Sequence, residues 1–140
     1  MGGIFTEEYY VTMIKIDTQN DMVLNVKVDE AEITEHIVIS ANVNGNEILV
    51  SNENYLPAFQ EFRDKILRLG YGLKCNGSRL NVIQSGMMGA CDKVYLVEPG
   101  KQALMKDVVH IWEYADVDTF PTSQEQNEYA EKWFSSLRRF

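Results

Sequence analysis

The sequence predicts an α+β fold: a single domain, residues 1–140, whose mainly antiparallel sheet is covered by a central and a C-terminal helix. Three observations predict it. Strand-like runs separated by polar turns fill the first 51 residues, a helical period follows at residues 54–70, and a helix-start motif follows a proline near the C-terminus. The 140 residues, 45% of them hydrophobic, suit one packed core.

Four strand-like runs in the first third of the chain predict an N-terminal meander. Residues 9–16 are rich in aromatic and β-branched side chains, and Leu24, Val26 and Val28 alternate with polar residues. Residues 36–43 and 47–51 flank Asn44-Gly45-Asn46, and an Asn-Gly step readily supplies the positive φ angles of a hairpin turn. We expect the segment between the second and third strands, residues 29–32, to be an acidic loop.

The predicted central helix starts after Asn54, a residue type that caps helices, and carries Pro57 in its first turn. Gly70 stands where a C-terminal glycine ends a helix. The apolar stripe expected to cover the sheet consists of Phe59, Phe62 or the aliphatic stem of Arg63, Ile66 and Leu69.

The second half of the chain predicts shorter elements. Residues 71–75, 80–84, 94–97 and 108–114 read as strands. Pro121 precedes Thr122-Ser123-Gln124-Glu125, the capping-box pattern that opens the C-terminal helix. The loop at residues 85–92 is punctuated by glycines and unusually apolar, so we expect it to bear on function.

The net charge of −8 is unevenly distributed along the chain. Residues 1–35 carry −6, residues 36–112 carry +1 and residues 113–140 carry −3. Such a negative field repels phosphate backbones and steers basic proteins toward the chain, so we expect no direct nucleic-acid binding. An acidic surface that serves only solubility is the alternative reading.

The residues that usually carry catalysis are sparse. His36 and His110 belong to no metal-ligand spacing, and no nucleophile elbow or phosphate-binding loop is present. Cys75 and Cys91 lack a CxxC spacing and are expected to be reduced thiols. We therefore expect a protein that is not an enzyme and has no metal ion and no cofactor.

The sequence also bears on location. No run approaches the roughly 20 apolar residues of a membrane-spanning helix. The first residues lack the basic and apolar regions of a secretion signal, since Ile4-Phe5-Thr6 leads directly into Glu7 and Glu8. We expect a soluble, cytoplasmic protein without membrane contact.

One segment resembles a known family. Residues 75–87, which begin Cys75-Asn76-Gly77-Ser78 and end Ser85-Gly86-Met87, resemble the Cys-x-Gly-Ala/Ser…Val-x-x-Ser-Gly-Met signature of a family of small bacterial proteins. Tyr95, Asp107-Val108-Val109 and Pro121 stand at matching places, so the resemblance runs from about residue 54 to residue 133. Family members usually carry charged residues after Ser-Gly-Met, whereas this chain has Met88-Gly89-Ala90.

The resemblance implies a function in bacterial competition. Some members of the family are associated with polymorphic-toxin and contact-dependent growth inhibition loci, where small acidic proteins serve as immunity factors. It implies that this chain binds and neutralises a basic cognate toxin, with nucleases as one candidate class, through an acidic face. The candidate partner-binding residues are Asp29, Glu30, Glu32, Glu35, Trp112 and Tyr114, with Tyr9, Tyr10 and Trp133 as further aromatic anchors.

A second hypothesis stays open beside the first. The chain could bind a small molecule or nucleotide, or be a minor enzyme, through the loops at residues 76–92. The residues that would line that site are Asn76, Arg79, Ser85 and Met87. A concave pocket with converging polar groups there would favour a ligand, and a flat acidic face would favour a protein partner. The Asn-Gly-Ser and Ser-Gly-Met elements could equally be turn and packing devices.

Overall fold

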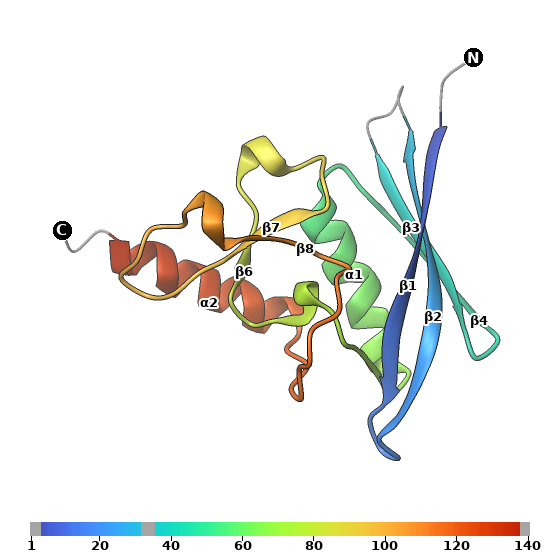
Figure 1. Cartoon of the computed structure of the whole chain (residues 1–140). Coiled ribbons are helices and arrows are strands. Elements are labelled where there is room, and N and C mark those ends of the chain that lie inside the picture. The colour runs from blue at the N-terminus through green and yellow to red at the C-terminus, as the bar shows by residue number, and fades with distance from the viewer. Residues whose placement is uncertain (1–3, 32–35, 138–140) are drawn as a thin grey trace.

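The computed structural model describes residues 4–31 and 36–137, and it has the predicted α+β fold (Figure 1). Its strands are β1 (Ile4–Lys15), β2 (Asn20–Ala31), β3 (Ile37–Val43), β4 (Asn46–Asn52), β5 (Tyr71–Leu73), β6 (Val82–Ile83), β7 (Lys93–Leu96) and β8 (Val108–His110). Its helices are α1 (Tyr55–Arg68) and α2 (Ser123–Ser136), with 3₁₀ turns at Asn76–Ser78, Gly86–Met88 and Met105–Asp107.

The N-terminal meander is confirmed and is the larger of two sheets. Its strand order is β4-β3-β2-β1-β5, with antiparallel pairing throughout. The β3–β4 turn has positive φ angles of 50° at Asn44 and 86° at Gly45, as the Asn-Gly step predicted. Strands β6, β7 and β8 form a second, smaller antiparallel sheet.

Helix α1 covers one face of the larger sheet, which we call the inner face (Figure 1). Phe59, Phe62 and Ile66 are fully buried there, as the stripe predicted, whereas Leu69 is 39% exposed. Gly70 follows the helix with a φ of 93°. The inner-face side chains of β1 to β4 complete this core with Val11, Met13, Leu24, Val26, Val28, Ile37, Ile39, Val43 and Val50.

The side chain of Asn54 does not cap α1, contrary to the prediction. Instead, the backbone N–H of Tyr55 donates to the carbonyl of Gly89 at 2.7 Å, and that of Leu56 donates to Oε1 of Gln84 at 3.0 Å. The helix start therefore takes its partners from a loop about 30 residues away in sequence.

Helix α2 begins as predicted but packs elsewhere. Thr122 accepts from the backbone N–H of Glu125, and Glu125 accepts from that of Thr122, which is the expected capping box. However, α2 does not cover the larger sheet: it packs against α1 and β6, on the side of α1 away from that sheet (Figure 1). The fold therefore places α1 between the larger sheet and a layer made by α2 and the smaller sheet.

Several predicted strand boundaries were wrong. Strand β2 continues to Ala31, so the first three residues of the expected acidic loop at 29–32 belong to a strand. Strand β8 ends at His110, which leaves Trp112 and Tyr114 beyond it. The cross-strand pairing of β1 with β2 explains the longer strand, because Phe5 lies opposite Glu30 and Thr6 opposite Asp29.

Candidate protein-binding site

Side chains from β1, β2 and a distant loop meet on the inner face of the larger sheet, just beyond its core. Alternation along β1 puts Glu7 and Tyr9 on the same face as the buried Val11. Along β2, the same alternation puts Glu30 on the face of the buried Val28. Asp92 reaches this place from the segment that precedes β7.

The hydroxyl of Tyr9 lies at the centre of this group. It donates to the carboxylate of Glu7 and lies 3.5 Å from Oδ2 of Asp92. The same Asp92 oxygen lies 3.3 Å from Nδ1 of His110. We call Glu7, Glu30 and Asp92 the acidic cluster.

The surroundings of Glu30 are unfavourable to its ionised form. Burial, followed by the negative charges of Glu7 and Asp92, raises the pKa of Glu30 above its ordinary value. Burial and the hydrogen bond to Glu7 likewise raise the pKa of Tyr9. Glu7 and Asp92 therefore lie close enough to Glu30 to repel its ionised carboxylate.

Little basic charge compensates them. Among residues 4–31 and 36–137, the carboxylates in ion pairs with lysine or arginine are Asp21, Asp64 and Glu98. Lys27 lies opposite Glu8 in the β1–β2 ladder but makes no ion pair with it. The cluster's own basic contact is His110, which is charged only when protonated. The cluster therefore carries negative charge that no lysine or arginine of the described residues pairs with.

The structure brings together some of the sequence-predicted partner-binding residues. Glu30 belongs to the acidic cluster, and Asp29 follows on the opposite face of β2, where it accepts a hydrogen bond from Thr6. Glu32 and Glu35 lie outside the described residues. Sequence reasoning missed Glu7 and Asp92, although the period-2 pattern of β1 could have placed Glu7 beside Tyr9.

Trp112 does not lie on the surface, so its assignment as a docking anchor was wrong. It is 5% exposed, stacks on Tyr9 with ring centroids 5.6 Å apart, and meets the ring of Phe59 edge-on at 5.1 Å. A side chain enclosed in this way contributes to the core. Tyr114, by contrast, is 58% exposed.

The other aromatic candidates also include both exposed and buried side chains. Tyr10 is 71% exposed on the outer face of the sheet, whereas Tyr9 is half-buried. Trp133 is buried and donates a 2.9 Å hydrogen bond to the carbonyl of Lys101. Of the aromatic candidates, Tyr10 and Tyr114 are therefore the ones with large exposed surfaces.

The four residues of the alternative ligand site do not converge. Asn76 is buried and donates to the carbonyl of His110, and its Oδ1 accepts from Nε of Arg79. Ser85 lines a pocket of about 250 Å³ at the start of α1, while Met87 is fully exposed. The residues that line this pocket include the amide side chains Asn54, Gln60, Gln84 and Asn127 together with the apolar Leu56 and Pro57.

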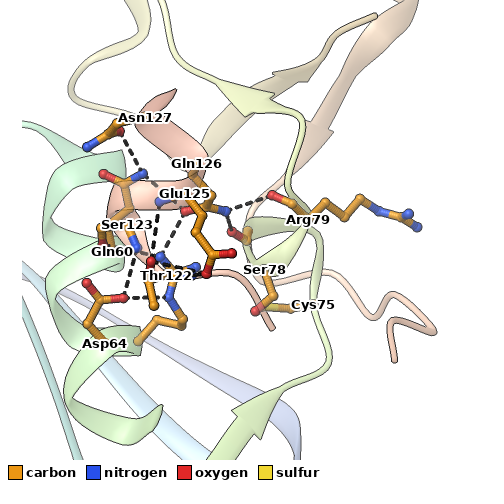
Figure 2. Close-up of polar contacts among 12 residues, drawn as sticks. Gln60, Asp64, Cys75, Ser78, Arg79, Thr122, Ser123, Glu125, Gln126 and Asn127 are labelled. Atoms are coloured by element: carbon orange, nitrogen blue, oxygen red, sulfur yellow. Dashed lines mark hydrogen bonds and ion pairs between the residues drawn. The ribbon is translucent and has the colours of Figure 1, made fainter. Parts of the chain in front are cut away.

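A buried polar network joins α1 to α2, and sequence reasoning missed it (Figure 2). Gln126 is 1% exposed and accepts from Arg63 at 2.8 Å and from Gln60 at 3.1 Å. It donates to the carbonyls of Gly77 and Arg79 at 2.8 and 2.7 Å. The guanidinium of Arg79 extends away from this network in Figure 2. The network thus ties the turn at residues 77–79 to both helices.

Arg63 is the charged member of that network and has no exposed surface. Its Nε lies 3.0 Å from Asp64 and its guanidinium also donates to Ser123 at 3.2 Å. Burial lowers the pKa of Arg63, although the interaction with Asp64 opposes this effect. The sequence predicted only that its aliphatic stem would be covered, because a pattern does not show where a charged end will find partners.

Neither cysteine lies in an arrangement suited to nucleophilic chemistry. Cys75 is completely buried, and burial raises the pKa of its thiol to about 11. Cys91 is half-buried, with its Sγ 3.3 Å from the carbonyl of Met88. No group of three or more candidate metal-binding side chains occurs within the part of the chain that the structure describes.

No protein-family model and no curated protein matches this sequence. The resemblance at residues 75–87 therefore remains a prediction. Neither helix of the described chain is long and apolar enough to cross a membrane.

Proposed function

We propose that this chain is an immunity protein of a bacterial toxin system, which acts in the cytoplasm by binding a basic protein toxin through its acidic cluster, without catalysis of its own. One observation supports the proposal most: Glu7, Glu30 and Asp92 are held together without a lysine or arginine partner among the described residues. A fold gains nothing from this repulsion, whereas a cationic partner would relieve it.

The position of the cluster suits a partner protein. Its carboxylates adjoin Glu8 and Asp29 on the other face of the same strands, so both faces of one sheet end carry negative charge. Tyr10, 71% exposed, stands beside them. An exposed tyrosine is a residue type that interfaces favour, and the carboxylates beside it are complementary to a basic partner. On a nuclease toxin they would occupy the basic cleft that otherwise receives the phosphates of its substrate.

The small-molecule alternative has less support. The pocket beside Ser85, at about 250 Å³, is smaller than the usual 300–1,000 Å³ of ligand sites. Its wall residue Gln84 is already engaged, since its Nε2 donates to the carbonyls of Cys91 and Lys93 and its Oε1 accepts from Leu56. No charged residue of the described chain lines this pocket, whereas the acidic cluster holds three carboxylates.

The direct test measures binding to the basic protein encoded by the adjacent gene. We expect a complex whose association rate falls steeply as salt rises. The variant Glu7→Gln/Glu30→Gln/Asp92→Asn should slow association by about tenfold or more at low salt, because steering by charge is lost.

The matched control removes the same number of charges elsewhere. Glu53, Glu61 and Glu131 are exposed and lie outside the cluster. Their triple substitution by glutamine should leave the association rate within about threefold of wild type. Equal losses in the two triple variants, or absence of a complex, would contradict the proposal.

A further inference from the structure

Strand β1 has a free edge over its N-terminal half. The neighbour on that side, β5, has three residues and pairs with Met13, Ile14 and Lys15. The remainder of β1 has no strand beside it on this side, within residues 4–31 and 36–137.

Alternation of hydrogen bonding identifies the backbone groups on this edge. Lys74 donates to the carbonyl of Thr12, and the N–H of Ile16 donates to Gly70, so even-numbered residues of β1 direct their backbone groups toward β5. Thr6, Glu8 and Tyr10 continue the even-numbered series. Their backbone N–H and C=O groups therefore point out of the free edge. All three residues are exposed.

The free edge of β1 lies beside the acidic cluster. Side chains of β1 alternate across it, with Glu7 in the acidic cluster on the inner face and Glu8 on the outer face. A second copy of this chain is a poor occupant, because antiparallel pairing of two β1 edges would bring Glu7 and Glu8 of each copy against the other. A strand with alternating basic side chains would be complementary on both faces.

The other free edge of the sheet provides a comparison. Strand β4 is also terminal, and its closing pair Val43–Asn46 directs the backbone groups of Glu47, Leu49 and Ser51 outward. Strand β4 carries one carboxylate, Glu47, whereas β1 carries Glu7 and Glu8 and has Glu30 and Asp92 near Glu7. Charge therefore distinguishes β1 from β4.

We propose that an extended, basic segment of the partner pairs with the β1 edge at Thr6, Glu8 and Tyr10, so that it continues the ladder begun by β5. This inference rests on the proposed function and specifies how the partner is held. Main-chain hydrogen bonds hold the segment, and alternate side chains reach the acidic cluster on one face and Glu8 with Tyr10 on the other. The paired stretch of about five residues spans roughly 17 Å.

The edge is tested on the wild-type chain with a peptide of alternating lysine and threonine, using amide hydrogen exchange. At millimolar peptide, exchange at the N–H groups of Thr6, Glu8 and Tyr10 should slow by about fivefold or more, while that of Ser51 on β4 should not change. Unchanged exchange at the three β1 amides overturns the proposal. Equal slowing by a peptide of alternating glutamate and threonine overturns its basic chemistry.

Three variants test the edge against the basic protein encoded by the adjacent gene. Glu8→Pro removes an outward N–H, which an edge strand tolerates, and should weaken binding by about tenfold. Glu8→Gln keeps that N–H and removes the charge, and should lose less than Glu8→Pro. Ser51→Pro removes the corresponding N–H of β4 and should leave binding unchanged. Far-ultraviolet circular dichroism checks that each variant is folded.

These measurements separate the two proposals. A complex that depends on the acidic cluster but is unaffected by Glu8→Pro supports the proposed function and overturns pairing at β1. Absence of a complex with the neighbour-encoded protein contradicts the proposed function, and the peptide measurement then still decides whether the edge accepts a basic strand.

Discussion

The indole Nε1 of Trp112 donates a 2.7 Å hydrogen bond to the hydroxyl oxygen of Tyr55 inside the core. Tyr55 is 1% exposed at the start of α1, and Trp112 lies beyond β8. The bond joins the helix to the layer behind it and satisfies a buried donor. It also explains why Trp112 is a core residue.

Tyr55→Phe removes the acceptor of this bond and leaves the indole N–H without a partner. We expect the free energy of unfolding to fall by about 1–3 kcal/mol, as measured by urea denaturation. Tyr114→Phe is the control, because Tyr114 is 58% exposed, and it should change stability by less than about 0.5 kcal/mol. Equal effects in the two variants would show that the buried bond is not the cause.

Gln126→Ala should be more damaging than Tyr55→Phe. The substitution removes four hydrogen bonds at once and leaves the carbonyl of Gly77 and the guanidinium of Arg63 short of partners. We expect a loss of about 3 kcal/mol or more in thermal or urea unfolding. Gln124→Ala, on the exposed side of the same helix, should stay within about 0.5 kcal/mol of wild type.

Gly77→Ala tests whether the Asn-Gly-Ser element serves packing. A Cβ at Gly77 would lie 2.7 Å from the ring of Phe59 and 2.9 Å from Ile111, which must then move. We expect a loss of about 1–3 kcal/mol in unfolding free energy. Gly86, in the Ser-Gly-Met element, has open space where a Cβ would lie. The Gly86→Ala variant should therefore have the same unfolding free energy as wild type. A neutral Gly77→Ala variant would contradict the close packing.

Glu30→Gln should stabilise the fold while weakening partner binding. The pKa of Glu30 is raised in the folded chain, so the folded chain binds its proton more tightly than the unfolded chain does. As the pH rises above the unfolded-state pKa of about 4.5, ionisation of Glu30 therefore lowers the free energy of unfolding. This loss reaches its full size at pH values above the folded-state pKa.

The measurement is the midpoint temperature of unfolding as a function of pH. At pH near 7 the Glu30→Gln variant should unfold at a higher temperature than wild type, and the difference should shrink as pH falls below about 4.5. Glu53→Gln removes an exposed carboxylate and should show no comparable difference. If the midpoint temperature of Glu30→Gln were higher than that of wild type by the same amount at every pH, the stabilisation would come from packing and not from charge.

Thiol reactivity should distinguish the two cysteines. Cys75 is completely buried and its pKa is raised to about 11, so it should react with a thiol reagent only when the chain opens. Cys91 is half-buried and should react first. Mass spectrometry after brief labelling should find the modification at Cys91, and labelling of Cys75 at the same rate would contradict its burial.

Local signals in the sequence determined a large part of this fold. The Asn44-Gly45 step set the β3–β4 turn, and Thr122 with Glu125 set the start of α2. The stripe of Phe59, Phe62 and Ile66 identified the buried side of α1. Each signal depends on residues within a few positions of one another, so the amino-acid sequence alone is enough to find it.

Only the tertiary structure decided which distant residues meet. It placed Asp92 beside Glu7 and Glu30, and it buried Trp112 against Tyr55. These residues are separated by dozens of positions in the sequence, and their proximity follows from how the larger sheet and the layer of α2 and the smaller sheet pack on either side of α1. Composition gave the chain its negative charge, but packing decided where carboxylates would be held together, because contact between remote segments depends on global burial and not on local pattern.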